Sequence, residues 1–94
     1  MRFAWDERKN RRNRRKHGVP FEKATRVFDD PHALSTLERI EDDEERWQTI
    51  GLVDGVIVLL VAHTFYDIEG ELAARIISAR KASTKERIIY EENR

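Results

Sequence analysis

The spacing of hydrophobic residues changes near residue 32, and this change predicts the order of the elements. A short strand is expected at 2–5, then a polar helix ending at Gly18, then a helix over 20–29 whose apolar residues recur three and four positions apart. Beyond these, strands are expected at 33–40, 46–54, 56–64 and 72–80, followed by a helix at 84–92. This order predicts an α+β fold: a small, mainly antiparallel sheet with two N-terminal helices and one C-terminal helix.

Local signals define the helix ends. Asp6 stands where the first helix needs an N-cap, and Gly18 follows its last turn. Pro20 suits the first turn of the second helix, because that position needs no backbone N–H. Ser83 followed by Glu86 is a capping-box pattern, which opens the last helix.

Composition and charge restrict the class of protein. The 94 residues are expected to form one domain, 1–94, and contain no cysteine, which excludes disulfides, thiol catalysis and thiolate metal sites. The longest apolar run, 56–62, is too short to span a bilayer, so a soluble, cytoplasmic protein without membrane contact is expected. The net charge of zero hides a basic cluster at 8–16 and an acidic one at 38–45.

The basic segment has a one-sided pattern. It holds no apolar residue, but Asp6, Asn10, Asn13 and His17 recur on one face of a helix. One interpretation is that these polar groups form hydrogen bonds inward while the arginine stems cover apolar surface and pair with acids. The other is that the helix binds phosphates.

His63 lies at the end of the apolar strand, in phase with Ile57, Leu59 and Val61, where a polar group needs a partner. It is either a structural histidine or a group that exchanges protons near neutral pH. The three histidines lack the spacing of metal ligands, so neither a metal site nor another cofactor is expected.

The segment RIISARKA, 75–82, has strand alternation. This alternation places Ile76, Ser78 and Arg80 on one face and Arg75, Ile77, Ala79 and Lys81 on the other. Arg80 and Lys81 then lie beside the N-terminus of the last helix. One interpretation is a phosphate site formed by these two cations, which Arg46 could join; the other is an ordinary charged strand end. Trp47 and Tyr90 either stack on bases or pack in the core.

Several motifs along the chain resemble those of a known family. FAWDERKNRRNRRKHGVPFEKATRVFDDP, residues 3–31, resembles the opening of the BrnT toxins of bacterial type II toxin–antitoxin pairs. The resemblance continues through Glu45-Arg46, Ile50-Gly51 and His63-Thr64 to RIISARKA, and thus covers nearly the whole chain. KHGVxF, where x is position 20, and RIISARKA are its most specific motifs. The chain departs from the family pattern at Pro20 and over 65–75.

The resemblance implies a fold similar to RelE-like ribonuclease toxins and RNA cleavage that inhibits translation. It implies a BrnA-like antitoxin, contact with operator DNA only through that antitoxin, and a toxin homodimer within the complex. Two other functions stay open: a non-catalytic RelE-like module that binds RNA or protein, and a plain interaction domain.

Cleavage by the RNA's own 2′-hydroxyl needs a base, a cation for the phosphate and an acid, but no metal. His63 is the candidate base or acid, with Glu45 as an alternative base. The cations predicted to stabilise the phosphate are Arg46, Arg80 and Lys81. The predicted RNA contacts are Arg75, Lys16, Arg12, Arg15 and Tyr90.

Overall fold

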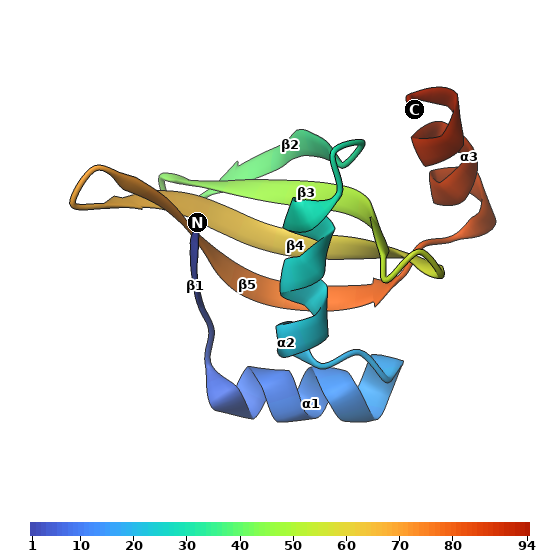
Figure 1. Cartoon of the computed structure of the whole chain (residues 1–94). Coiled ribbons are helices and arrows are strands. Elements are labelled where there is room, and N and C mark those ends of the chain that lie inside the picture. The colour runs from blue at the N-terminus through green and yellow to red at the C-terminus, as the bar shows by residue number, and fades with distance from the viewer.

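A computed structural model of the chain describes residues 1–94 (Figure 1). Its elements are β1 (Arg2–Ala4), α1 (Glu7–His17), α2 (Phe21–Ala24), the 3-10 helix η1 (Thr25–Asp29), β2 (Leu34–Glu41), β3 (Glu44–Val53), β4 (Ile57–Ile68), β5 (Glu71–Lys81) and α3 (Thr84–Glu92). The predicted α+β class and the order of the elements are confirmed. No helix is long and apolar enough to cross a membrane.

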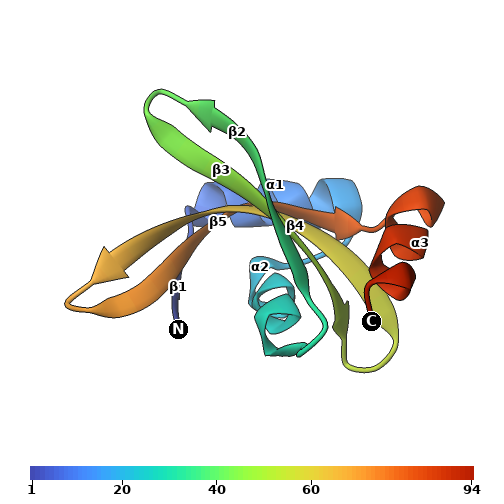
Figure 2. The same ribbon diagram turned by 90° about the horizontal axis from the view of Figure 1, so that it is seen from above.

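The five strands form one sheet in the order β1-β5-β4-β3-β2. Strands β2 to β5 are an antiparallel meander, as predicted, but β1 pairs with β5 in parallel, so the sheet is mixed. Parallel neighbours need a long connection, and here α1, α2 and the meander supply it. Figure 2 shows the β2–β3 and β4–β5 hairpins diverging at their far ends.

Two departures from the predicted elements have local causes. The expected helix over 20–29 divides into α2 and the tighter η1, a common ending for a helix. Strand β4 continues past Thr64 to Ile68, where a loop was expected. Glu69 and Gly70 both have positive φ, the backbone of a two-residue hairpin turn that lets the two strands stay paired up to it.

One face of the sheet carries the main core. Figure 1 shows α2 lying across this face and α1 running below it, along the edge of the sheet. The buried core residues are Val19, Phe21, Ala24, Val27, Val53, Leu59, Val61, Ile76 and Ala79. At Gly51 an added Cβ would lie 2.9 Å from both Cβ and the carbonyl oxygen of Val27. Only glycine therefore lets η1 approach β3 this closely.

The opposite face is called the open face here, because only α3 covers part of it. Tyr90 of α3 is fully buried and packs with Ile50 and Leu60. Its hydroxyl donates a hydrogen bond to Asp30, which also accepts one from the backbone N–H of Leu52. Burial and the Asp30 carboxylate raise the pKa of Tyr90 to about 12, so the hydroxyl keeps its proton and anchors the end of α3.

Candidate functional site

A β-bulge at Ile77 decides which side chains of β5 share a face. The register against β4 skips Ile77, since Ile76 and Ser78 lie opposite consecutive residues of that strand. The predicted alternation, with Ile76 facing the same way as Arg80, is therefore wrong. Ile76 joins the core instead, and Arg75 lies on the same face as Ser78 and Arg80.

Three arginines lie on the open face as a result. Arg75 and Arg80 come from β5, and Arg46 comes from β3, where its neighbour Trp47 faces the other way. Lys81 lies opposite the core residue Leu59, so its side chain is on the covered face. The three cations predicted to share one phosphate are thus divided between two faces.

Arg80 is held by a two-pronged ion pair with Glu86 of α3. Its Nη1 donates to Oε1 of Glu86 at 2.7 Å and its Nη2 to Oε2 at 3.0 Å. Glu86 also accepts from the backbone N–H of Ser83, which completes the predicted capping box. The Arg80 guanidinium, together with these Ser83 contacts, lowers the pKa of Glu86 to about 2, so the pair stays ionised at neutral pH.

Arg75 and Arg46 differ in how many carboxylates lie near their guanidinium groups. Arg75 is exposed, and no carboxylate lies within 4.0 Å of it. Arg46 lies 3.3 Å from Glu44 and 3.8 Å from Glu41, and its Nε is buried without a hydrogen-bond partner. Glu45, the alternative base, is exposed on the strand position next to Arg46 and so faces the opposite way.

The His63 side chain is fully buried on the covered face, in the predicted phase. Its Nε2 lies 2.6 Å from the Thr49 hydroxyl, and Phe28 and Phe65 pack edge-on at 4.9 and 4.7 Å between centroids. Burial lowers the pKa of His63 to about 4, so the imidazole is neutral at neutral pH. For His63 to contact RNA as a base or acid, this side of the sheet would have to open.

The two predicted stacking aromatics are packed within the fold. The Tyr90 side chain has no exposed surface, because it lies between α3 and the sheet. The ring centroids of Trp47 and Phe65 are 5.5 Å apart. A base reaches Tyr90 only if α3 moves. Tyr66, which lies where the sequence predicts a loop, is 37% exposed on the open face; strand periodicity continued past residue 64 places it there.

Asn10 and Asn13 of the polar stripe point inward, as the first interpretation of the basic segment predicts, but the acid pairing that it also predicts for the arginines is wrong, because no carboxylate lies within 4.0 Å of them. The side-chain amide of Asn13 donates to the carbonyl of Ala79 at 2.8 Å and accepts from its N–H at 3.1 Å, which continues the ladder at the edge of β5. The Asn10 side chain accepts from the backbone N–H of Phe21 at 2.8 Å. Asp6 instead caps the helix through the N–H groups of Arg8 and Lys9, as predicted.

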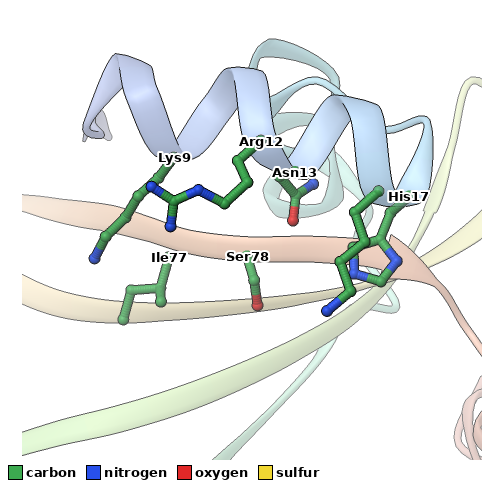
Figure 3. Close-up of a pocket in the computed structure, with 7 residues that line it drawn as sticks. Lys9, Arg12, Asn13, His17, Ile77 and Ser78 are labelled. Atoms are coloured by element: carbon green, nitrogen blue, oxygen red, sulfur yellow. The ribbon is translucent and has the colours of Figure 1, made fainter.

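A groove of about 230 Å³ lies between α1 and β5, and it is called the α1–β5 groove below. Its lining residues are Lys9, Arg12, Asn13, Lys16, His17, Ile77 and Ser78. In Figure 3 the side chains of Lys9, Arg12 and His17 extend from α1 toward the strand. The groove brings together two predicted RNA contacts, Arg12 and Lys16, but not Arg15. Lys9 is not among the predicted RNA contacts, although its spacing to Arg12 and Lys16 places all three on one flank of the helix.

A second hollow, of about 370 Å³, lies between the open face and α3, within the size range of small-ligand sites, about 300–1,000 Å³. Its lining residues are Leu34, Thr36, Gln48, Ile50, Leu60, Ser83, Lys85, Glu86 and Ile89. The Arg80–Glu86 ion pair borders it through Glu86. It is called the α3 hollow below.

The fold and these surfaces together define a class: a small α+β protein whose open sheet face carries arginines from two strands. Residues 5–86 match the family model described as the ribonuclease toxin BrnT of type II toxin–antitoxin systems. The chain belongs to this BrnT family.

Structural comparison agrees with this assignment. The crystal structure of the ribonuclease toxin BrnT of Brucella abortus is similar with a TM-score of 0.62 and 28% sequence identity. The match covers 89% of this chain and 99% of that one. A search of curated proteins found no match. Membership implies that the chain has an antitoxin partner and an RNA target.

Proposed function

We propose that this chain is a toxin with a RelE-like fold that cleaves RNA on its open face, without a metal, and thereby inhibits translation. The observation that carries the proposal is the bulge at Ile77, which brings Arg75 onto the same exposed face as Arg80 and Arg46. An RNA strand lying on this face would meet cations from two strands of one rigid sheet.

The chemistry follows from what attack by a 2′-hydroxyl requires. The attacking oxygen loses a proton, the phosphorus becomes five-coordinate with added negative charge, and the 5′-oxygen of the next nucleotide leaves with a proton. Guanidinium groups are suited to stabilising the added negative charge on the five-coordinate phosphorus, since their planar donors match phosphate oxygens. Arg75, without a carboxylate partner, is the strongest candidate, and Arg80 and Arg46 assist it.

The proton transfers are the less constrained part of the proposal. His63 would act only after the covered side opens, because its imidazole is fully buried. Glu45 is exposed but lies on the other side of the strand from Arg46. Charge stabilisation by the arginines therefore carries most of the proposed rate enhancement.

The α3 hollow is the proposed position of a nucleotide beside the cleaved bond. Its lining is mixed, with Leu34, Ile50, Leu60 and Ile89 beside the polar Thr36 and Gln48. This combination of apolar walls and a few polar groups is typical of small-molecule sites. Glu86 connects the hollow to Arg80.

The test incubates the purified protein with RNA in EDTA, comparing the wild type with Arg75→Gln and Lys81→Gln. Each variant loses one positive charge from the same strand. The two residues face opposite sides of the sheet, so only Arg75→Gln removes a cation from the open face. The proposal predicts cleavage by the wild type, a fall of about 100-fold for Arg75→Gln, and little change for Lys81→Gln. RNA binding without cleavage by the wild type would identify a non-catalytic module instead.

We further propose that the antitoxin partner of this chain is BrnA-like. It would neutralise the toxin, link the toxin to operator DNA and hold the toxin as a homodimer. Family membership supports an antitoxin, and the exposed edge strand β2, with Leu37 and Ile40 at 45% and 65% exposure, offers it a surface. Coexpression with the product of the neighbouring reading frame tests this. Copurification with restored growth is expected, and unrelieved toxicity would contradict it.

A further inference from the structure

The α1–β5 groove lies apart from the α3 hollow, and the proposed cleavage chemistry makes no use of it. Six of its seven lining residues are polar or charged, and Ile77 is the exception. No Phe, Tyr or Trp lines it, and the imidazole of His17 is its one ring. A ligand in this groove is therefore recognised mainly by charge and hydrogen bonding, since the groove offers no broad aromatic surface for stacking.

The cations of the groove are not compensated within the protein. None of the seven Lys and Arg residues of α1 has a carboxylate within 4.0 Å. The acids close to the helix are engaged otherwise: Asp6 caps its N-terminus, and Glu7 and Glu22 accept from the Asn10 amide. An anionic ligand would meet Lys9, Arg12 and Lys16 without displacing an internal partner.

The groove is also rigidly built. Asn13 fixes α1 to Ala79 through two hydrogen bonds, so the helix cannot slide along the strand. Lys9 and Lys16 are separated by seven residues, a rise of about 10 Å, with Arg12 between them. The three cations thus form a row along the edge of the sheet, long enough for more than one phosphate.

We infer that the α1–β5 groove binds the sugar–phosphate backbone of the RNA beyond the cleaved bond. This inference rests on the proposed function, because it assumes that RNA lies on the open face. Ser78 connects the two sites, since it lines the groove and shares its face with Arg75 and Arg80. RNA leaving the arginines of β5 toward the sheet edge would enter the groove directly.

An acidic protein segment is the competing ligand for such a groove. Protein interfaces bury an apolar or aromatic centre, whereas this groove offers only Ile77. The lining suits a uniform polyanion better than a folded partner. The groove is therefore expected to add affinity for RNA without adding sequence preference.

The experiment compares two triple variants that lose the same charge from the same helix. Lys9→Gln/Arg12→Gln/Lys16→Gln removes the three cations of the groove, and Arg8→Gln/Arg11→Gln/Arg14→Gln removes three exposed cations that do not line it. Both keep Asn10 and Asn13. Binding of a fluorescent 12-nucleotide RNA, made resistant to cleavage by 2′-O-methylation, is measured by anisotropy over a range of salt concentrations.

The groove variant is expected to bind about 10- to 100-fold more weakly than the wild type at 100 mM salt. The slope of log K against log salt should decrease by about 2, since each lost contact with a single strand removes about 0.7. For the control variant, which keeps the cations of the groove, both the affinity for RNA and the salt dependence should change much less. Equal losses in both variants, or no loss in either, would overturn the inference.

Two further measurements keep the result interpretable. The groove variant should cleave a dinucleotide with wild-type kcat/KM while its KM for long RNA rises, because a dinucleotide does not reach the groove. If the wild type cleaves no RNA, the proposed function fails, but anisotropy still decides the binding site.

Loss of antitoxin binding with unchanged RNA binding would assign the groove to the protein partner and overturn the inference. If the triple variant does not fold, Arg12→Gln against Arg11→Gln repeats the comparison.

Discussion

Lowering the pH from 7 to 5 should destabilise this protein mainly through His63. Its imidazole is fully buried, and burial lowers its pKa to about 4, against an ordinary value of 6.5. The unfolded chain therefore takes up a proton over a range in which the folded protein does not. Stability from the neutral imidazole is fully present above pH 6.5 and is lost as the pH falls toward 4.

The size of the effect follows from these two pKa values. At pH 5 the unfolded histidine is almost fully protonated and the folded one is about 10% protonated, which corresponds to about 2 kcal/mol lost between pH 7 and pH 5. The pair of Glu86 and Arg80 contributes little here, because the ordinary pKa of Glu86, 4.5, and its folded pKa of about 2 both lie below pH 5. A loss of this size is a considerable part of the stability of a small domain.

Urea unfolding at several pH values between 7 and 5 measures the effect. The wild type should lose about 2 kcal/mol, and His63→Gln should lose much less over the same range. His32→Gln, at an exposed loop position, should keep the full wild-type dependence. The reasoning would be refuted if the imidazole of His63, followed by NMR, titrated near 6.5 in the folded protein, because solvent would then reach the ring.

Three substitutions test the packing that builds the site, each by the change in urea midpoint. Gly51→Ala should destabilise by about 1–3 kcal/mol, because the new Cβ would lie 2.9 Å from Val27. Asn13→Ala should cost about 2–3 kcal/mol, since it leaves the backbone N–H and carbonyl of Ala79 and the carbonyl of Val19 without this partner. Tyr90→Phe should cost about 2 kcal/mol by removing the hydrogen bond to the Asp30 carboxylate. Midpoints equal to that of the wild type would show that these contacts do not contribute to stability.

Much of the fold was predictable because its signals are local. The caps at Asp6, Gly18 and Ser83 are short-range patterns, and the structure confirms all three. The stripe that holds Asn10 and Asn13 is visible from helical periodicity, and its inward orientation is confirmed for these two residues.

The site was less predictable because its geometry depends on pairing between strands. A bulge at Ile77 leaves the residue types of β5 unchanged, so the alternation of RIISARKA gave no sign of it. The parallel pairing of β1 brings together residues about seventy positions apart in the chain, which no local pattern reports. The burial of His63 follows from the aromatic rings around it, and Phe28 comes from a different part of the chain.

The bulge also has a functional meaning within the proposal. With strict alternation, Arg75 and Arg80 would lie on opposite faces, and the open face would lose its one uncompensated arginine of β5. Bulges are known to redirect side chains next to active sites. We therefore expect the length of β5 between Arg75 and Arg80 to matter more than its composition.

Methyl NMR with a 2′-O-methylated RNA tests the central claim, binding to the open face, most directly. Ala62 and Val61 are neighbours on β4 whose methyl groups lie on opposite faces, the open and the covered one. RNA should shift the Ala62 methyl signal and give intermolecular contacts to it, while the Val61 methyls remain unchanged. Shifts confined to Val61 and the covered face, with Ala62 unaffected, would contradict the account.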